Sequence, residues 1–102
     1  MSYPGVYFVT MEFEWDAEKD QQNQGKHGVS FEEASTAFGD PFALTIGDPD
    51  HSWEEQRFLT TGYTNGQRLV IVSHVDREER IRLISARDVT AAERRNYEEE
   101  PK

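Results

Sequence analysis

The sequence has no cysteine among its 102 residues. Disulfide bonds, thiolate catalysis and cysteine-ligated zinc sites are therefore excluded within this chain. The opening residues also lack the basic, apolar and small-residue regions of a secretory signal peptide. Both absences indicate a cytoplasmic protein, because thiols stay reduced in the cytoplasm and structural disulfides are rare there.

Long apolar runs are absent as well. Hydrophobic residues make up 35% of the chain and charged residues 30%. No stretch approaches the ~20 consecutive apolar residues that a membrane-spanning helix needs. A chain of this length has room for one hydrophobic core, so we expect a single small domain with no membrane segment.

Basic side chains are scarce in the first half of the chain. Residues 1–56 contain Lys19 and Lys26 against twelve acidic side chains, whereas residues 57–102 contain nine basic side chains against eight acidic ones. This asymmetry favours one acidic surface for a basic protein partner and one arginine-bearing surface for an anion. Trp53, in an acidic loop, is expected to be exposed and to serve as the apolar anchor for such a partner.

Hydrophobic periodicity predicts the element order β-α-α-β-β-β-β-α. Ser30 and Glu33 form a capping-box pattern before a helix, and Asn65-Gly66 is a hairpin signal. The expected strands are residues 11–15, 42–46, 57–63, 68–75 and 80–86, and the expected helices are residues 17–24, 31–38 and those from 91 onward. This order predicts an α+β domain with an antiparallel sheet over residues 11–102, preceded by an N-terminal extension of residues 1–10.

Residues 80–97 join a strand, a turn and a helix, and they are rich in arginine. Strict alternation gives the strand two faces. One face carries Ile81, Leu83 and Ser85, and the other carries Arg82, Ile84 and Ala86. Thr90 and Glu93 form a second capping-box pattern, which predicts that the last helix begins near residue 91.

The arginines of this segment are suited to binding an anion. A guanidinium binds phosphate oxygens through two parallel hydrogen bonds and stays charged at any cellular pH. Arg80 and Arg82 share a strand face and Arg77 lies in the preceding turn, so all three are expected to contact one anionic surface. The plain alternative is a solvated surface in which Arg80 and Arg82 pair with Glu78 and Glu79.

Groups that could transfer a proton are few. His27 stands beside Lys26 in a loop flanked by glycines, where a histidine is either a surface or capping residue or a base. The other histidines, His51 and His74, share no metal-ligand spacing with it, so no metal site is expected. No cofactor is expected either, because the sequence has no glycine-rich phosphate loop.

Several of these motifs, in their order and spacing, resemble the BrnT toxins of bacterial type II toxin–antitoxin systems. The matching stretches extend over everything after Met11. They are FEWD at residues 13–16, NQGKHGVSFEEA at 23–34, DP at 40–41, DPDHS at 48–52, EQRF at 55–58, RIRLISAR at 80–87 and ERRNY at 93–97. The resemblance implies a RelE-like ribonuclease fold and an RNA-cleaving toxin. It also implies a BrnA-like antitoxin that wraps the toxin and binds operator DNA.

The resemblance further implies where cleavage takes place. In a RelE-like fold the sheet carries the site and the C-terminal helix lies against it, so Arg57, Arg87 and Tyr97 are expected to meet there. Lys26 and His27 are expected to complete the site, one of them accepting the 2′-OH proton. The two arginines would stabilise the phosphorane, and Tyr97 would position the nucleotide or act as the acid. RNA phosphates are expected at Arg77, Arg80, Arg82 and Arg94.

Two functions are compatible with these residues. The first is a metal-independent endoribonuclease that inhibits translation until an antitoxin neutralises it. The second is a non-catalytic binding module that only pairs with a basic, DNA-binding partner. Arginines alone do not separate the two, because both classes carry charged surfaces, whereas cleavage also needs groups that transfer protons.

Overall fold

The computed structural model describes residues 11–50 and 55–99. They form five strands, three α-helices and one 3₁₀ helix, in an order that confirms the prediction. In chain order these elements are β1 (Glu12–Glu14), α1 (Ala17–His27), α2 (Phe31–Ser35), η1 (Thr36–Gly39), β2 (Leu44–Gly47), β3 (Arg57–Tyr63), β4 (Leu69–Arg77), β5 (Arg80–Asp88) and α3 (Ala91–Glu99). The expected extension at residues 1–10, His51 and Trp53 lie outside the described residues.

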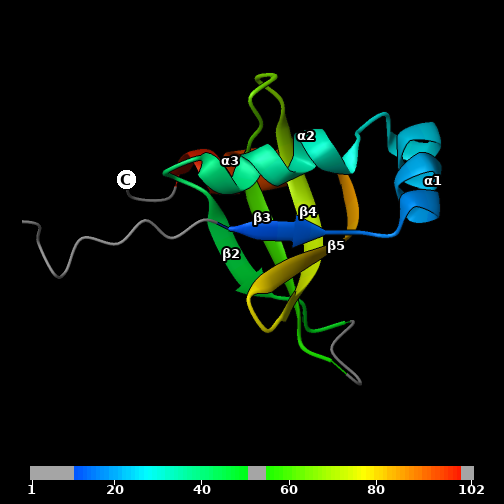
Figure 1. Ribbon diagram of the computed structural model, residues 1–102. Coiled ribbons are helices and arrows are strands. Elements are labelled where there is room, and N and C mark those ends of the chain that lie inside the picture. The colour runs from blue at the N-terminus through cyan, green and yellow to red at the C-terminus, as the bar shows by residue number, and fades with distance from the viewer. Residues whose placement is uncertain (1–10, 51–54, 100–102) are drawn as a thin grey trace, which may run out of the picture.

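The five strands make one sheet in the order β1-β5-β4-β3-β2 (Figure 1). Strands β2 to β5 form an antiparallel meander, as predicted. The difference lies at β1, which pairs with β5 in parallel. A parallel neighbour needs a long crossover connection, and here the chain passes through the helices and three other strands between β1 and β5. The sheet is therefore mostly antiparallel.

The hydrophobic core lies between one face of the sheet and the α2–η1 segment, and we call this the core face. Ser30 begins α2 as predicted, since its Oγ accepts the Glu33 N–H at 3.0 Å. Ser30 is thus the N-cap, and the first residue of the helix is Phe31, whose side chain is fully buried. The core consists of Val29, Phe31, Ala34, Ala37, Val70, Val72, Leu83 and Ala86.

A β-bulge interrupts the pairing of β4 with β5. Ser73 lies opposite Ser85, but His74 lies opposite Leu83, so Ile84 is an extra residue without a partner on β4. The strict alternation expected for this strand is therefore wrong beyond Leu83. Leu83 and Ala86, which were expected on opposite faces, both belong to the core.

The first helix is longer than predicted. Instead of ending at Gln24, α1 continues to His27 and is capped by Gly28, which has a left-handed φ of 70°. Lys26 and His27 therefore occupy the last turn of a helix rather than a loop between glycines. In the described part of the chain, no helix is both long and apolar enough to cross a membrane.

Candidate functional site

The second face of the sheet, opposite the core face, carries five arginines from three strands. Cross-strand partners point to the same side of a sheet, so the register identifies the face. Arg57 and Arg82 both lie opposite Val75, and Ile71, on the same face of β4, lies opposite Arg87. We call this surface the arginine face; its arginines are Arg57, Arg77, Arg80, Arg82 and Arg87.

The bulge at Ile84 brings Arg87 onto this face. In a strand without a bulge, Arg82 and Arg87 would point to opposite sides, because their positions differ by five, an odd number. With it, both lie on the side away from the core face. The expectation that Arg80, Arg82 and Arg77 share one surface is consistent with the register, and Arg87 joins them.

Carboxylates of β1 hold the two arginines in the first half of β5. Arg80 lies 3.3 Å from a Glu12 carboxylate oxygen and 3.5 Å from one of Glu14, and Arg82 Nη1 lies 3.1 Å from the other Glu14 oxygen. The hydrogen bond from Arg82 holds the pKa of Glu14 below its ordinary value. The pairing partners thus come from the neighbouring parallel strand, where the plain alternative expected Glu78 and Glu79.

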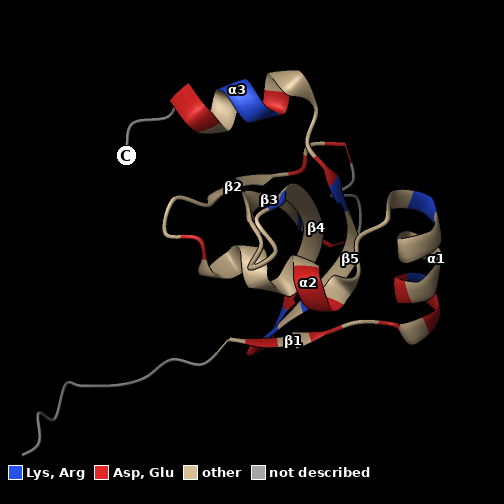
Figure 2. Cartoon of the chain, turned by 90° about the horizontal axis from the view of Figure 1, so that it is seen from above, with Lys and Arg blue, Asp and Glu red and all other residues tan. Residues whose placement is uncertain are grey.

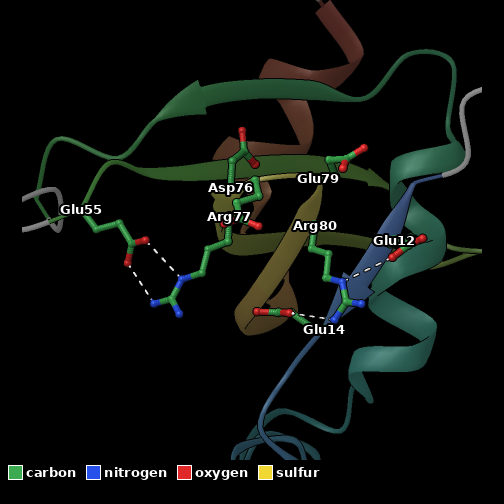
Figure 3. Close-up of a pocket in the computed structure, with 8 residues that line it drawn as sticks. Glu12, Glu14, Glu55, Asp76, Arg77, Glu79 and Arg80 are labelled. Atoms are coloured by element: carbon green, nitrogen blue, oxygen red, sulfur yellow. Dashed lines mark hydrogen bonds and ion pairs between the residues drawn. The ribbon is translucent and has the colours of Figure 1, made fainter.

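These pairs border an open cavity of about 710 Å³ (Figure 3). Arg77, at the end of β4, also borders the cavity, and its Nη2 lies 3.2 Å from Glu55 Oε1. Six carboxylates and two guanidiniums line the cavity: Glu12, Glu14, Glu55, Asp76, Glu78 and Glu79 with Arg77 and Arg80. An anion that reaches Arg77 or Arg80 therefore competes with a carboxylate that the arginine already contacts.

At the other end of β5, Arg87 makes a bidentate charge pair with Glu93. Its two terminal nitrogens each lie 2.9 Å from one oxygen of Glu93. Glu93 also accepts the Thr90 N–H at 2.8 Å and donates its own N–H to Thr90 Oγ1, the capping box predicted from the sequence. The hydrogen bond from Arg87 lowers the pKa of Glu93 to about 2, and the same bond raises the pKa of Arg87.

The Glu93 pair predicts a loss of stability in acid. The carboxylate has a pKa of about 2 when folded and 4.5 as a free side chain. The pair therefore stabilises the fold fully above pH 4.5, and that contribution disappears as the pH falls toward 2. Because both side chains are partly exposed, the loss should be only on the order of 1 kcal/mol.

Urea unfolding between pH 5 and pH 2 measures this loss. The Glu93→Gln variant should show a flatter dependence of unfolding free energy on pH than the unsubstituted protein. Glu98→Gln, which changes an exposed carboxylate on the same helix, is the matched control and should keep the original dependence. Equal flattening by both substitutions would contradict a specific role of Glu93.

Tyr97 is buried on α3, with 5% of its surface exposed. Its hydroxyl donates a 2.6 Å hydrogen bond to Asp40, and its ring packs edge-on against Tyr63 at 5.7 Å between centroids. Burial, and next the Asp40 carboxylate, raise the pKa of Tyr97 to about 12. Arg94, one turn earlier, donates to the Tyr63 hydroxyl at 3.2 Å. Both predicted residues of α3 thus contact the end of β3.

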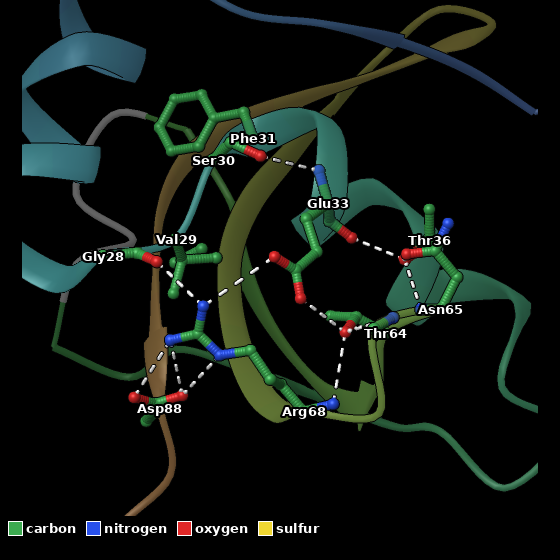
Figure 4. A network of polar contacts seen from close by, with 12 residues as sticks. Gly28, Val29, Ser30, Phe31, Glu33, Thr36, Thr64, Asn65, Arg68 and Asp88 are labelled. Carbon is green, nitrogen blue, oxygen red and sulfur yellow. Dashed lines mark hydrogen bonds and ion pairs between the residues drawn. The ribbon is translucent and has the colours of Figure 1, made fainter.

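The residues that follow Lys26 and His27 contact the end of β5 that carries Arg87, not the end of β3 that carries Arg57. The chain after His27 is joined to the end of β5 through Arg68, which donates to the Gly28 carbonyl at 2.8 Å and pairs with Asp88 (Figure 4). Arg57 lies two strands and four residues away from Arg87, which corresponds to roughly 16 Å between Cα atoms. The structure therefore does not bring the five residues expected in one site together. Arg57 and Arg87 lie at opposite ends of the arginine face. Lys26 and His27 lie in the last turn of α1, and Tyr97 lies on α3.

The third histidine that was considered as a metal ligand, His74, is a core residue. Its Nε2 lies 2.8 Å from Thr60 Oγ1, and its ring packs between Phe38 and Phe58. Burial lowers the pKa of His74, so the neutral ring is favoured. Among the residues that the structure describes, no three His, Asp or Glu side chains are placed to hold a metal ion.

Helix α3 lies on the side of the sheet away from α2 (Figure 2). Residues of β2, β3, β4 and α3 line an apolar groove, and one of them is Glu93, the partner of Arg87. The volume of the groove is about 330 Å³. The edge strand β2 contributes Ile46, which is 60% exposed. The groove is lined by Leu44, Thr45, Ile46, Leu59, Thr61, Ile71, Glu93 and Asn96.

Two residues with important contacts near Arg87, Asn23 and Arg68, were missed by the sequence analysis. Asn23 is buried in α1 and bonds to the backbone of Ala86. The only local signal was a polar residue in a helix that has no apolar stripe, and such a residue is usually solvated. Arg68 follows the hairpin turn and gave no signal, because its partners are distant in the sequence.

Comparison with known proteins gives a consistent result. The family described as "Ribonuclease toxin, BrnT, of type II toxin-antitoxin system" matches residues 15–93. The crystal structure of the ribonuclease toxin BrnT from Brucella abortus is similar in fold, with a TM-score of 0.58 and 24% sequence identity over 79% of this chain and 99% of that one. No curated protein sequence matches the chain. Because the family pattern extends over most of the chain, from the residue after β1 through the first turn of α3, the protein belongs to the BrnT family of type II ribonuclease toxins.

Proposed function

We propose that this protein is the toxin of a type II pair and acts as a metal-independent endoribonuclease in the cytoplasm, where it inhibits translation by cleaving RNA. The observation that supports this most is the gathering of five arginines from three strands on one face of the sheet. Guanidiniums on a shared surface suit the RNA backbone, because phosphate contacts fix the register of a nucleic acid without reading its bases.

In the proposed reaction, His27 or Lys26 accepts the proton of a ribose 2′-OH. The 2′ oxygen then attacks the adjacent phosphorus, and the bond from phosphorus to the 5′ oxygen breaks. Arg87 stabilises the charge that develops on the phosphorane, and Tyr97 positions the nucleotide or protonates the leaving 5′ oxygen. The products carry a 2′,3′-cyclic phosphate and a 5′-OH.

Arg57 is assigned to a neighbouring phosphate, since it lies at the other end of the arginine face. In this proposal Arg57 binds RNA phosphates together with Arg77, Arg80 and Arg82. Arg94, on α3, contacts the RNA strand at the Arg87 end of the face. For Tyr97 to serve as the acid, its hydroxyl must give up its hydrogen bond to Asp40 and donate to the substrate instead.

The proposed partner is a BrnA-like antitoxin with a basic surface, and operator DNA is contacted only through that antitoxin. The acidic side chains of the first half of the chain and the carboxylates around the 710 Å³ cavity support a basic partner. Charges at such an interface mainly set the association rate and specificity.

The test is to incubate the purified protein with a long RNA in EDTA, with and without the product of the adjacent gene. Cleavage in EDTA with 2′,3′-cyclic phosphate ends, suppressed by the partner, is expected. Cleavage that requires added metal would contradict metal independence. Tight binding to the partner without any cleavage would favour the second function, a non-catalytic binding module.

The carboxylates of β1 should restrain RNA binding. Glu14→Gln removes the carboxylate that pairs with Arg82 and one of the two carboxylates that contact Arg80. The affinity for RNA should therefore rise, and its salt dependence should steepen by about one phosphate contact. Fluorescence anisotropy over a salt series measures both quantities. Glu32→Gln, on the exposed side of α2, removes the same charge and is the control. Equal gains in both variants would mean that net charge alone is responsible.

A further inference from the structure

Asn23 joins α1 to the edge of β5. Its side chain is buried, with 6% of the residue exposed, and it makes three hydrogen bonds to backbone groups. The amide nitrogen donates to the carbonyls of Val29 and Ala86, both at 2.8 Å, and the amide oxygen accepts the Ala86 N–H at 3.1 Å. One side chain thus bonds to both backbone groups of Ala86.

These bonds take the place of the hydrogen bonds that a neighbouring strand would make to Ala86. The partner strand β1 pairs with β5 only from Arg80 to Arg82, so it provides no ladder for the second half of β5. An unpaired backbone group in a buried position is costly, and the asparagine amide can both donate to the Ala86 carbonyl and accept from the Ala86 N–H. Asn23 is also the only buried residue of α1. The position of α1 therefore depends on this amide more than on apolar packing.

Arg68 makes a second connection between the same two segments (Figure 4). Its guanidinium donates to the Gly28 carbonyl at 2.8 Å and to both Asp88 oxygens at 3.1 and 3.2 Å. A Glu33 carboxylate oxygen lies 3.8 Å from the same guanidinium. Because the guanidinium is planar and rigid, contacts on two sides fix the distance between Gly28 and Asp88.

The two connections are made by residues that adjoin the candidate catalytic groups in the sequence. Gly28 and Val29 directly follow His27, and Ala86 and Asp88 stand on either side of Arg87. Asn23 bonds to Val29 and Ala86, whereas Arg68 bonds to Gly28 and Asp88. Each connection therefore ties the end of α1 to one neighbour of Arg87.

We propose that Asn23 and Arg68 are positioning residues, which hold the last turn of α1, with Lys26 and His27, in a fixed place beside Arg87. This inference rests on the proposed function, in which one of these α1 side chains takes the 2′-OH proton and Arg87 stabilises the phosphorane. The chemistry requires both groups to reach one phosphate, and a displacement of about 1 Å can lower such a rate by up to a hundredfold. Neither Asn23 nor Arg68 needs to touch RNA.

Asn23→Ala tests the inference in the full-length protein, with Asp20→Ala as the matched control. Asp20 also ties α1 down, since its carboxylate accepts the Phe31 N–H at 2.8 Å, but that contact leads to α2 and not to β5. Two measurements are made on each variant. Nuclear magnetic resonance follows the Arg87 Nε–H and the His27 ring, and single-turnover assays follow RNA cleavage at saturating substrate.

Asn23→Ala should shift both resonances and lower the cleavage rate by roughly ten- to a hundredfold, with little change in the RNA concentration at half-saturation. Asp20→Ala should leave both resonances and the rate near their original values. The double variant Asn23→Ala/His27→Ala should cleave no more slowly than His27→Ala, because the two residues act through one group. Additive losses would indicate a merely structural role and overturn the inference.

Arg68→Lys keeps the positive charge on a partly exposed side chain but loses the two-sided contact, so it provides the test if Asn23→Ala does not fold. It should shift the same two resonances and lower the rate in the same direction. Unchanged Arg87 and His27 resonances in a folded variant would overturn the inference whether or not RNA is cleaved. Absence of cleavage by the unsubstituted protein would instead contradict the proposed function, and the resonances would then decide the positioning role alone.

Discussion

Arg87→Ala is expected to lower the rate of RNA cleavage by a hundredfold or more. Removing one preorganised group that stabilises transition-state charge costs about that much in rate. The bidentate bonds to Glu93 hold the Arg87 guanidinium in place on the arginine face, so its orientation is set before substrate arrives. Single-turnover cleavage with a defined RNA measures the effect, after circular dichroism has confirmed folding.

Arg95→Ala is the matched control for this substitution. It removes the same charge from an exposed position on α3 and should change the rate by less than about twofold, as is usual for a surface charge. His27→Ala provides an independent check of the same site. If Arg87→Ala and His27→Ala both fold, bind the antitoxin and cleave RNA at the original rate, the site is wrong and the arginine segment is structural.

Gly62→Ala is expected to destabilise the fold by about 2 to 3 kcal/mol. Gly62 lies in β3 where η1 crosses the core face, and a Cβ at this position would stand 2.7 Å from the Ala37 carbonyl oxygen and 3.2 Å from Ala43 Cβ. The contact is with backbone, so it cannot be relieved by rotating a flexible side chain. Urea unfolding at neutral pH measures the loss.

Gly25→Ala is the opposite case. Gly25 lies inside α1, and a Cβ there would meet no atom within 4 Å. Alanine in a helix interior is more favourable than glycine by about 0.5 to 1 kcal/mol, so this variant should be slightly more stable than the unsubstituted protein. Destabilisation by both substitutions would argue against the close approach of η1 to β3 as the cause.

Where a short stretch of sequence carries the physical cause, the prediction from sequence was accurate. The side-chain caps at Ser30 and Thr90 formed as expected, since each needs only a side chain and a backbone group three residues apart. At Thr90 the Glu93 side chain completes the capping box, whereas the Glu33 carboxylate accepts a hydrogen bond from Thr64 instead. Strand β3, residues 57–63, was predicted to the residue. Its ends are set by local turn signals and by its own apolar residues, which a pattern of this length reveals.

The candidate site was harder to predict because its geometry depends on distant residues. The bulge at Ile84, which places Arg87 on the same face as Arg82, arises from the pairing of two whole strands. Glu14, the partner of Arg82, is 68 positions away in the chain. Asn23 bonds to a backbone group 63 positions away, and no spacing rule connects the two. Propensity identified the elements, but the contacts between them come from tertiary packing.

The pairing of arginines with carboxylates also determines how the protein meets RNA in solution. At 0.1 M salt, charges are screened beyond about 10 Å. At lower ionic strength a distant RNA would experience the formal net charge of −9, and each guanidinium on β5 is already balanced by a nearby carboxylate. Long-range attraction is then absent, and the encounter rate should rise when salt is first added, the reverse of the steering seen with basic nucleases. Recognition begins only at contact, when phosphates compete directly with Glu14 and Glu93 for their arginines.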